Sequence, residues 1–160
     1  MNVDDITPIV VGIDGSPAGD GALRWALDEA IIRGCPVHVV NAWDYEPLSD
    51  WAETAGKTAL LRSETLVGAA LRAAAVGRLE FPVVIRKSLR GNPAEVLAEA
   101  ARGNALLAVG SHSGHRLRDL VLGSTSSRCL LHASVPVVVI PFAAARTTTA
   151  PWTDHATDHA

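Results

Sequence analysis

Long apolar runs are missing from this chain of 160 residues, and so are clusters of cysteine and of basic residues. The apolar runs stop well below the roughly 20 residues that a membrane-spanning helix needs, so we expect no membrane partner. Cys35 and Cys129, the only cysteines, lack the spacing of a metal site, and we expect buried, reduced thiols. The formal net charge is −3 and the sequence has no dense run of basic residues. It therefore lacks the basic patch that binds nucleic acid, and we expect no nucleic-acid partner.

Three motifs of nucleotide-binding and catalytic proteins are also absent. The sequence GIDGS after the first apolar run lacks the lysine of a Walker loop, and GKT at residues 56–58 has Trp51 where the first glycine should be. No G-x-G-x-x-G follows the first apolar run, which argues against ordinary dinucleotide binding. No G-x-S-x-G is present either. We therefore expect no catalytic residues, no metal site and at most weak ATP hydrolysis.

The length and composition are those of one globular domain, with 48% apolar and 19% charged residues. The start, MNVDDITP, carries two acids and lacks the basic beginning and apolar centre of a secretory signal, which predicts a cytoplasmic protein. After Phe142 the sequence has no periodicity and little to bury. We predict one domain over residues 1–142 and a disordered tail over residues 143–160.

Short apolar runs alternate with helical stretches along the domain. The runs typical of strands are residues 9–13, 37–42, a segment within 81–91, 105–109 and 137–140. Between them lie stretches with helical periodicity and helix-start residues such as Ser16, Pro17 and Asn92. Helices of roughly 10 to 25 residues without tight hairpins between the strands predict parallel pairing. The expected fold is an open, doubly wound, five-stranded parallel α/β sheet with helices on both faces, which is Rossmann-like.

Glycine and serine concentrate in one segment, VGSHSGHRLRDLVLGSTSS at residues 109–127, between the last two strands. Ligands of open parallel sheets bind at the carboxyl ends of the strands where strand order reverses, so this segment should meet Asp14 and residues 41–43 there. Glycines let backbone N–H groups approach a ligand, and a helix starting at Ser124 would add free N–H groups. These features suit a phosphate, although an ordinary helix start with serine and glycine is the alternative.

Three segments resemble the universal stress proteins. They are VVGIDGSPAGDGALRWAL, GNPAEVLAEAA and VGSHSGHRLRDLVLGSTSSRCLLHASVPVVVIP, and the resemblance covers nearly all of residues 9–142. ATP-binding members of that family carry G-x-x-G, nine residues, and then G-[ST]. This chain has Gly110, Gly123 and Ser124 at matching positions and Ser113 in place of the middle glycine.

The resemblance implies that an adenine nucleotide lies across the strand ends. The implied cofactor is ATP, with or without magnesium, and AMP or a cyclic nucleotide is the alternative. The implied contacts run from the nucleoside end to the phosphates in the order Ile13, Asp14, Ala42, Val109, Gly110, Ser113, Gly123, Ser124, Thr125 and Ser126. The resemblance also implies a homodimer through the last strand, Val137–Ile140.

Ser113 is the departure that bears on this site. If the family's glycine supplies a positive φ, serine there costs about 1 kcal/mol, and if it supplies clearance, the hydroxymethyl group intrudes on the phosphate. A third outcome is that Gly114 takes over the flexible role and the Ser113 hydroxyl donates to the ligand.

From the resemblance as a whole we predict a dimeric, adenine-nucleotide-binding protein of stress response or regulation. The alternatives are a dimeric interaction protein that does not bind nucleotide and a slow ATPase.

Overall fold

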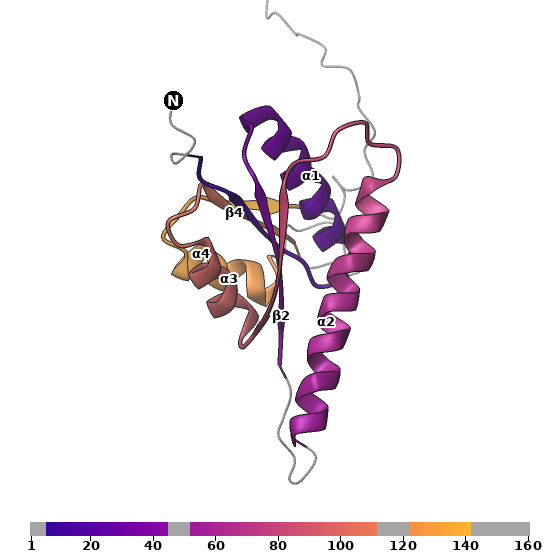
Figure 1. Ribbon diagram of the computed structural model, residues 1–160. Helices are drawn as coiled ribbons and strands as arrows, with labels where there is room; N and C mark the ends of the chain where they lie inside the picture. The colour runs from indigo at the N-terminus through magenta and orange to yellow at the C-terminus, as the bar shows by residue number, and fades with distance from the viewer. Residues whose placement is uncertain (1–5, 45–51, 112–121, 142–160) are drawn as a thin grey trace, which may run out of the picture.

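Strands and helices alternate along the chain, as the computed structural model shows for residues 6–44, 52–111 and 122–141. In chain order the elements are β1 (Ile9–Gly12), α1 (Pro17–Arg33), β2 (Val37–Trp43), α2 (Ala52–Ala75), β3 (Val84–Arg90), α3 (Pro93–Ala101), β4 (Leu106–Gly110), α4 (Ser124–His132) and β5 (Val137–Ile140). They build one sheet in the order β3-β2-β1-β4-β5 with every neighbouring pair parallel (Figure 1). The predicted doubly wound α/β fold is confirmed.

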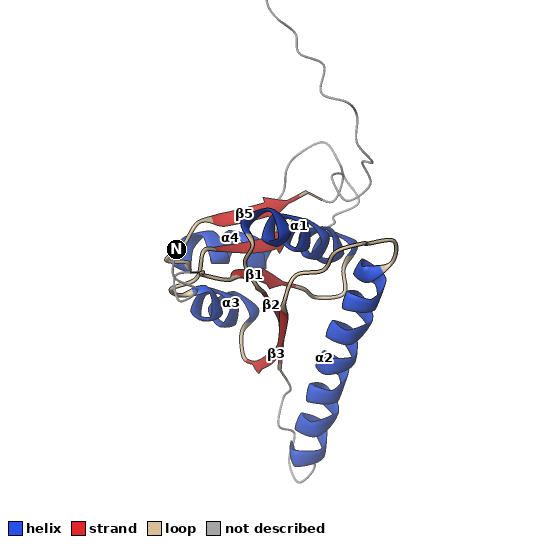
Figure 2. Cartoon of the chain, turned by 45° about the horizontal axis from the view of Figure 1, so that its top comes forward, coloured by secondary structure: helices blue, strands red, loops and turns tan. Residues whose placement is uncertain are grey.

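Helices cover both faces of the sheet, with α1 and α2 on one side and α3 and α4 on the other (Figure 2). Strand residues alternate between the two cores, so that Val11 packs with the α1 and α2 side and Val10 with the α3 and α4 side. Burial on both faces explains why the central strands read as continuous apolar runs rather than as alternating ones. Within the described parts of the chain, none of the helices is both long and apolar enough to cross a membrane.

Helix α1 begins and ends at the residues that its sequence indicates. The Ser16 hydroxyl oxygen accepts a hydrogen bond from the Gly19 N–H at 3.0 Å, and Pro17 follows at the first helical position. At the other end Gly34 adopts the left-handed conformation with φ 64°. These local signals fix where the chain leaves β1 and therefore where the turn at the end of β1 lies.

The two cysteines are free and buried on opposite sides of the sheet. Cys35 belongs to the core under α1 and α2, and Cys129 belongs to the core under α3 and α4. Because the sheet separates them, they cannot form a disulfide without disrupting the fold. Burial raises the pKa of the Cys129 thiol to about 11 and also raises the pKa of Cys35.

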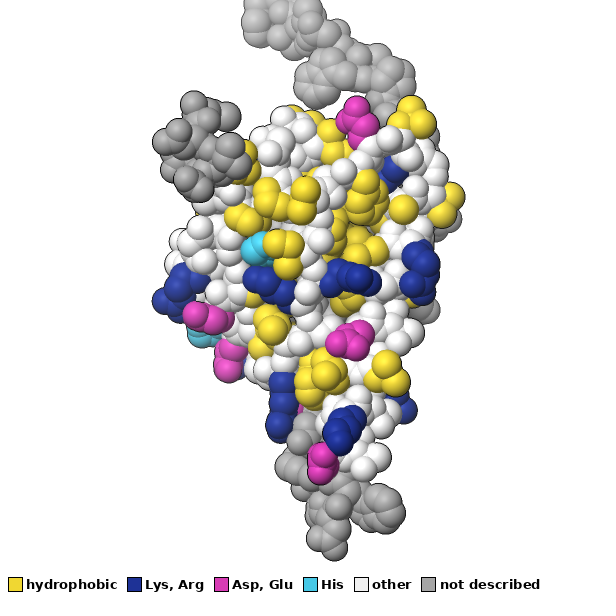
Figure 3. Space-filling view, in the orientation of Figure 1, with side chains coloured by type: hydrophobic (Ala, Val, Ile, Leu, Met, Phe, Trp, Pro, Cys, Tyr) yellow, Lys and Arg dark blue, Asp and Glu magenta, His cyan; other side chains and the backbone are white. Residues whose placement is uncertain are grey.

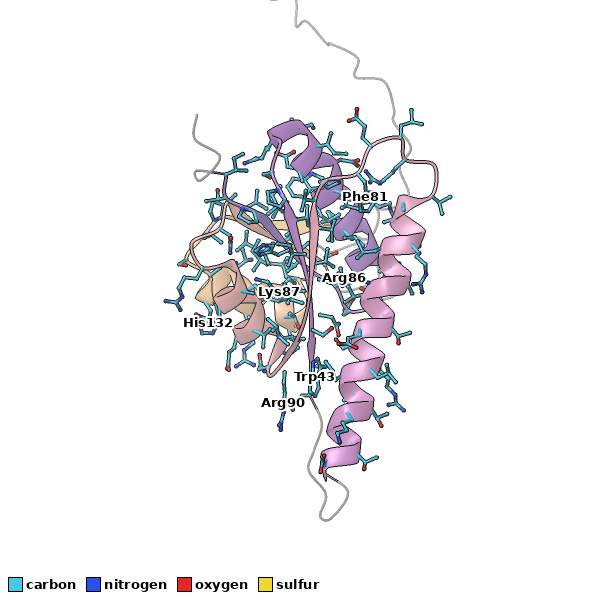
Figure 4. All side chains as sticks on the ribbon, viewed as in Figure 1. Trp43, Phe81, Arg86, Lys87, Arg90 and His132 are labelled. Carbon is cyan, nitrogen blue, oxygen red and sulfur yellow. The ribbon has the colours of Figure 1, made fainter. Side chains whose placement is uncertain are left out.

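Strand β3 forms one edge of the sheet and exposes both apolar and basic side chains. Ile85 and Leu89 are 43% and 36% exposed, and the face of the molecule over this strand shows apolar patches crossed by basic side chains (Figure 3). Arg86 and Lys87 lie on opposite sides of β3 (Figure 4). Charged side chains on an edge strand disfavour pairing with another chain.

Candidate functional site

A cavity of about 190 Å³ lies at the carboxyl ends of the central strands. Strand β1 lies between β2 and β4. The chain builds the sheet outward from β1 in one direction through β2 and β3 and in the other through β4 and β5, so the strand order reverses between β1 and β4. Open α/β sheets bind their ligands at this point. Residues from the ends of β1, β2 and β4 and from the starts of α1, α3 and α4 line it: Gly12, Ile13, Asp14, Ser16, Gly19, Val40, Ala42, Pro93, Leu97, Val109, Gly110, Ser111, Gly123, Ser124, Thr125 and Ser126.

Nine of the ten residues predicted as ligand contacts line this one cavity, and Ser113 lies outside the described residues. The sequence analysis missed the wall that α3 contributes through Pro93 and Leu97. The segment GNPAEVL could have indicated it, because Pro93 at the first helical position places the start of α3 at a strand end. Trp43, the last residue of β2, is not among the described lining residues and lies beside α2 (Figure 4).

The turn after β1 holds the Asp14 carboxylate in the cavity. The Ser16 N–H donates to Asp14 Oδ1 at 2.9 Å. A Cβ on Gly19 would stand 2.8 Å from that same oxygen, so the missing side chain lets the first turn of α1 come close to the carboxylate. Asp14 carries the only charge among the described lining residues. Its further lone pairs can accept hydrogen bonds from hydroxyl groups of a ligand.

The N-terminus of α4 opens into the same cavity. Its N-cap is Gly123, which has no side chain to satisfy the first N–H groups of the helix. The Ser126 hydroxyl turns back to donate to the Gly123 carbonyl oxygen at 3.0 Å. The first N–H groups of a helix have no acceptor within the helix and carry the positive end of its dipole. This end of the cavity therefore suits an anionic group.

Apolar side chains line the same cavity as the carboxylate and the helix end. Val40, Leu97 and Val109 line the cavity from β2, α3 and β4. Gly12 makes room for this wall, because a Cβ there would stand 2.6 Å from Leu97 Cδ1. A ligand that suits these lining groups combines an apolar part with hydroxyl donors for Asp14 and an anionic group for the N-terminus of α4.

A larger hollow of about 590 Å³ lies at the opposite edge of the sheet, near the amino ends of β1, β2 and β3. Its lining is mainly apolar and includes Ile6, Cys35, Phe81 and Val83. Glu80, the one charged side chain among the described residues that line it, is acidic and disfavours an anion. The smaller cavity at the carboxyl ends is therefore the better candidate site for a polar, anionic ligand.

The sequence model of the Universal stress protein family matches residues 6–141. The chain belongs to the universal stress protein family. A universal stress protein of Mycolicibacterium smegmatis is 35% identical over 142 residues, which cover 86% of this chain and 46% of that protein. One of Mycobacterium tuberculosis is 36% identical over 137 residues, which cover 82% and 44%. The chain thus spans about half the length of these curated relatives.

Solved structures of the universal stress protein family share the fold. UspA of Lactobacillus plantarum has a TM-score of 0.69 and 18% identity, and the match covers 84% of this chain and 97% of that one. The Archaeoglobus fulgidus protein in complex with dAMP has a TM-score of 0.57 and 24% identity, with coverage of 84% and 97%. An Arabidopsis thaliana family member with AMP bound has a TM-score of 0.54 and 18% identity, with coverage of 84% and 91%.

Proposed function

We propose that this universal stress protein binds an adenine nucleotide in the cavity at the carboxyl ends of β1, β2 and β4. The observation that carries the proposal is that one cavity is lined by the Asp14 carboxylate, by the N-terminus of α4, where the described residues supply no side-chain cap, and by apolar side chains. The family's solved complexes with AMP and dAMP support it, since both ligands have this combination of groups.

In this proposal the charges of the site orient the ligand. Asp14 repels phosphate and accepts hydrogen bonds from the ribose hydroxyls, so the nucleoside lies toward β1 and β2. The adenine ring contacts Val40 and Leu97, and backbone groups near Ala42 meet its edge. The phosphates lie at α4, where the N–H groups after Gly123 and the hydroxyls of Ser124 and Thr125 bind them.

ATP, with or without magnesium, is the ligand that we propose, and AMP and a cyclic nucleotide are the alternatives. The several hydroxyl and N–H donors around α4 can serve more than one phosphate group. The monophosphates dAMP and AMP in related structures favour the smaller ligands. Calorimetric titration with ATP and magnesium, AMP and cyclic AMP decides among them. We expect a micromolar Kd, about 8 kcal/mol of binding free energy, for at least one, and no heat from any of the three would contradict the proposal.

The Asp14→Ala variant tests the proposed orientation. Removal of the carboxylate takes away the acceptor for the ribose hydroxyls and should weaken binding by about ten- to 150-fold, since a hydrogen bond to a charged group contributes about 1.5–3 kcal/mol. Asp20→Ala is the matched control, because Asp20 is acidic and lies in the first turn of α1 but does not line the cavity. Equal affinities of the Asp14→Ala variant and the natural protein would overturn the orientation.

We also propose that the protein acts in the cytoplasm as a homodimer joined through β5, and that bound nucleotide changes its state or its partners. Strand β5 is an edge strand whose four residues are all half-buried. The carbonyl oxygens of Pro136 and Ile140 accept hydrogen bonds from N–H groups of β4 and of the residue after it. Along a parallel strand every second residue bonds to the same neighbouring strand, so the N–H of Val139 points away from β4.

Val139→Pro tests the dimer because it removes an outward N–H and leaves the bonds to β4 in place. Light scattering should report a dimer for the natural protein and a monomer for this variant. Ser88→Pro, at an outward position of the opposite edge strand β3, is the control that should stay dimeric. A monomeric natural protein at micromolar concentration would contradict the dimer without bearing on nucleotide binding.

A further inference from the structure

A buried pair of polar side chains links α2 to the end of β1. Asn41 Nδ2 donates to the Ile13 carbonyl oxygen at 2.7 Å, and the Ser63 hydroxyl donates to Asn41 Oδ1 at 2.6 Å. Asn41 and Ser63 are only 7% and 3% exposed. Both hydrogen bonds join residues more than 20 positions apart in the chain. The pair therefore connects three separate elements, α2, β2 and the segment that follows β1.

The chemistry of the three groups fixes the direction of these bonds. A carbonyl oxygen only accepts, so the amide nitrogen of Asn41 must face Ile13 and its oxygen must face Ser63. The hydroxyl of Ser63 is then the donor to that oxygen. If the Ser63 hydroxyl is removed, Asn41 Oδ1 stays buried but loses this donor. The cost of a buried acceptor that has lost its donor favours rotation of the amide group away from Ile13.

The Ile13 backbone is held at both of its polar groups by β2. Its N–H donates to the Val40 carbonyl oxygen at 2.9 Å, and its carbonyl accepts from Asn41. Ile13 lies one residue beyond the end of β1 and directly precedes Asp14. The Asn41 side chain thus extends the pairing of β1 with β2 by one bond, up to the residue that carries the carboxylate of the cavity.

We infer that Asn41 and Ser63 are positioning residues for the nucleotide site, which act through Ile13 to hold Asp14 at the ligand. Neither residue lines the cavity, so neither contacts the ligand itself. The inference rests on the proposed nucleotide binding and adds to it a role for α2. A shift of α2 that moves Ser63 would be transmitted to the carboxylate through two hydrogen bonds.

Ser63→Ala tests the inference because it removes one hydroxyl from a buried helix position. We expect the Kd for the tightest-binding adenine nucleotide to rise about five- to tenfold, the equivalent of about one hydrogen bond. Thr58→Ala is the matched control, since Thr58 is on the same helix, is exposed, and its hydroxyl donates to the Thr54 carbonyl oxygen of the helix backbone. The control should bind as the natural protein does.

The double variant Ser63→Ala with Asp14→Ala separates positioning from general loss of stability. If Ser63 acts through Asp14, its removal should have no further effect on Kd once the carboxylate is gone. Hydrogen exchange of the Ser16 N–H, which is bonded to Asp14, should also become faster in Ser63→Ala without ligand. Should Ser63→Ala fail to fold, Ser63→Cys, a weaker donor of similar size, replaces it in both measurements.

The outcomes distinguish the two proposals. If the natural protein binds no adenine nucleotide, the proposed function fails, and unchanged exchange at Ser16 in the Ser63 variant would then overturn the positioning role as well. If the natural protein binds and Ser63→Ala binds equally well, the positioning role alone is overturned. Additive losses in the double variant would also overturn it, because they would mean that Ser63 acts independently of Asp14.

Discussion

Gly110 lies so close to the backbone of Ala18 that no side chain fits between them. A Cβ on Gly110 would stand 2.4 Å from the carbonyl carbon of Ala18 and 2.6 Å from its carbonyl oxygen. Gly110 ends β4 and Ala18 lies in the first turn of α1, so this contact brings two walls of the cavity together. The glycine that the family motif assigns to ligand binding therefore also has a packing role.

The Gly110→Ala variant should lose stability and nucleotide affinity together. The added methyl group must push α1 away from the sheet, and overpacking of this kind costs about 1–3 kcal/mol. Urea denaturation measures the loss. Gly68→Ala in α2 is the control and should raise the free energy of unfolding. A Cβ there meets the end of the flexible Arg72 side chain, and alanine favours the helix by about 1 kcal/mol relative to glycine. Equal stability of Gly110→Ala and the natural protein would refute the packing role.

The Ser124→Asp variant should separate stability from binding. An acidic side chain in the first turn of α4 interacts favourably with the helix dipole and should stabilise the protein by about 0.3–1 kcal/mol. The same charge repels phosphate and should abolish nucleotide binding. Ser124→Asn introduces a side chain of nearly the same shape as aspartate but without its charge, and this variant should retain most of the affinity. Unimpaired binding by Ser124→Asp, measured by calorimetry beside a thermal melt, would mean that the phosphates do not lie at α4.

His38 should titrate below its ordinary range. Burial lowers the pKa of His38, and the neighbouring Lys87, whose Nζ is 3.2 Å from His38 Nδ1, lowers it further. Lys87→Met should therefore raise this pKa without restoring it fully, because burial is the larger cause. An NMR titration of the imidazole in both proteins measures the change, and an unchanged pKa would show that Lys87 does not contact His38 in solution.

The lowered pKa of His38 also predicts how stability depends on pH. The unfolded chain binds the proton more readily than the folded one, so the stability that neutral His38 contributes is present above the unfolded pKa of about 6.5. It is lost as the pH falls through the folded pKa. Compared with His38→Gln, the natural protein should lose more free energy of unfolding between neutral pH and pH 5. Parallel pH profiles of the two proteins would contradict this prediction.

Cys129 should resist thiol reagents while the protein is folded. Its pKa of about 11 leaves little thiolate at pH 8, and its side chain is fully buried. Cys35 is 7% exposed and should react first, although its pKa is also raised. Reaction with a chromogenic disulfide reagent, followed for the natural protein and for Cys35→Ala, measures both rates. Rapid labelling of Cys129 in the folded Cys35→Ala variant would contradict its place in the core.

Local sequence patterns predicted the elements, and the topology determined the site. Ser16 and Pro17 indicated the start of α1 because capping depends on neighbouring residues, and the same holds for Asn92 before α3. The contact of Gly110 with Ala18 could not be predicted, since it depends on which strands are neighbours and on how closely α1 packs on them.

The hydrogen-bonded pair of Asn41 and Ser63 was likewise missed, because an isolated asparagine in a strand gives no indication of its partner 22 positions away. The role of Ser113, which lies outside the described residues, remains the prediction made from the sequence. A calorimetric comparison of the natural protein with Ser113→Gly tests it: equal affinities mean that serine is tolerated there, and binding by the variant alone means that serine prevents it.

The central claim is that an adenine nucleotide occupies the cavity between Asp14 and the N-terminus of α4. An NMR titration of nitrogen-15-labelled protein with AMP, and with ATP and magnesium, tests it most directly. The account predicts saturable shifts of the amide signals of Gly110 and of residues 124–126, with little change around Phe81 in the hollow at the opposite edge of the sheet. Absence of shifts with either nucleotide, or shifts confined to that opposite hollow, would contradict the account.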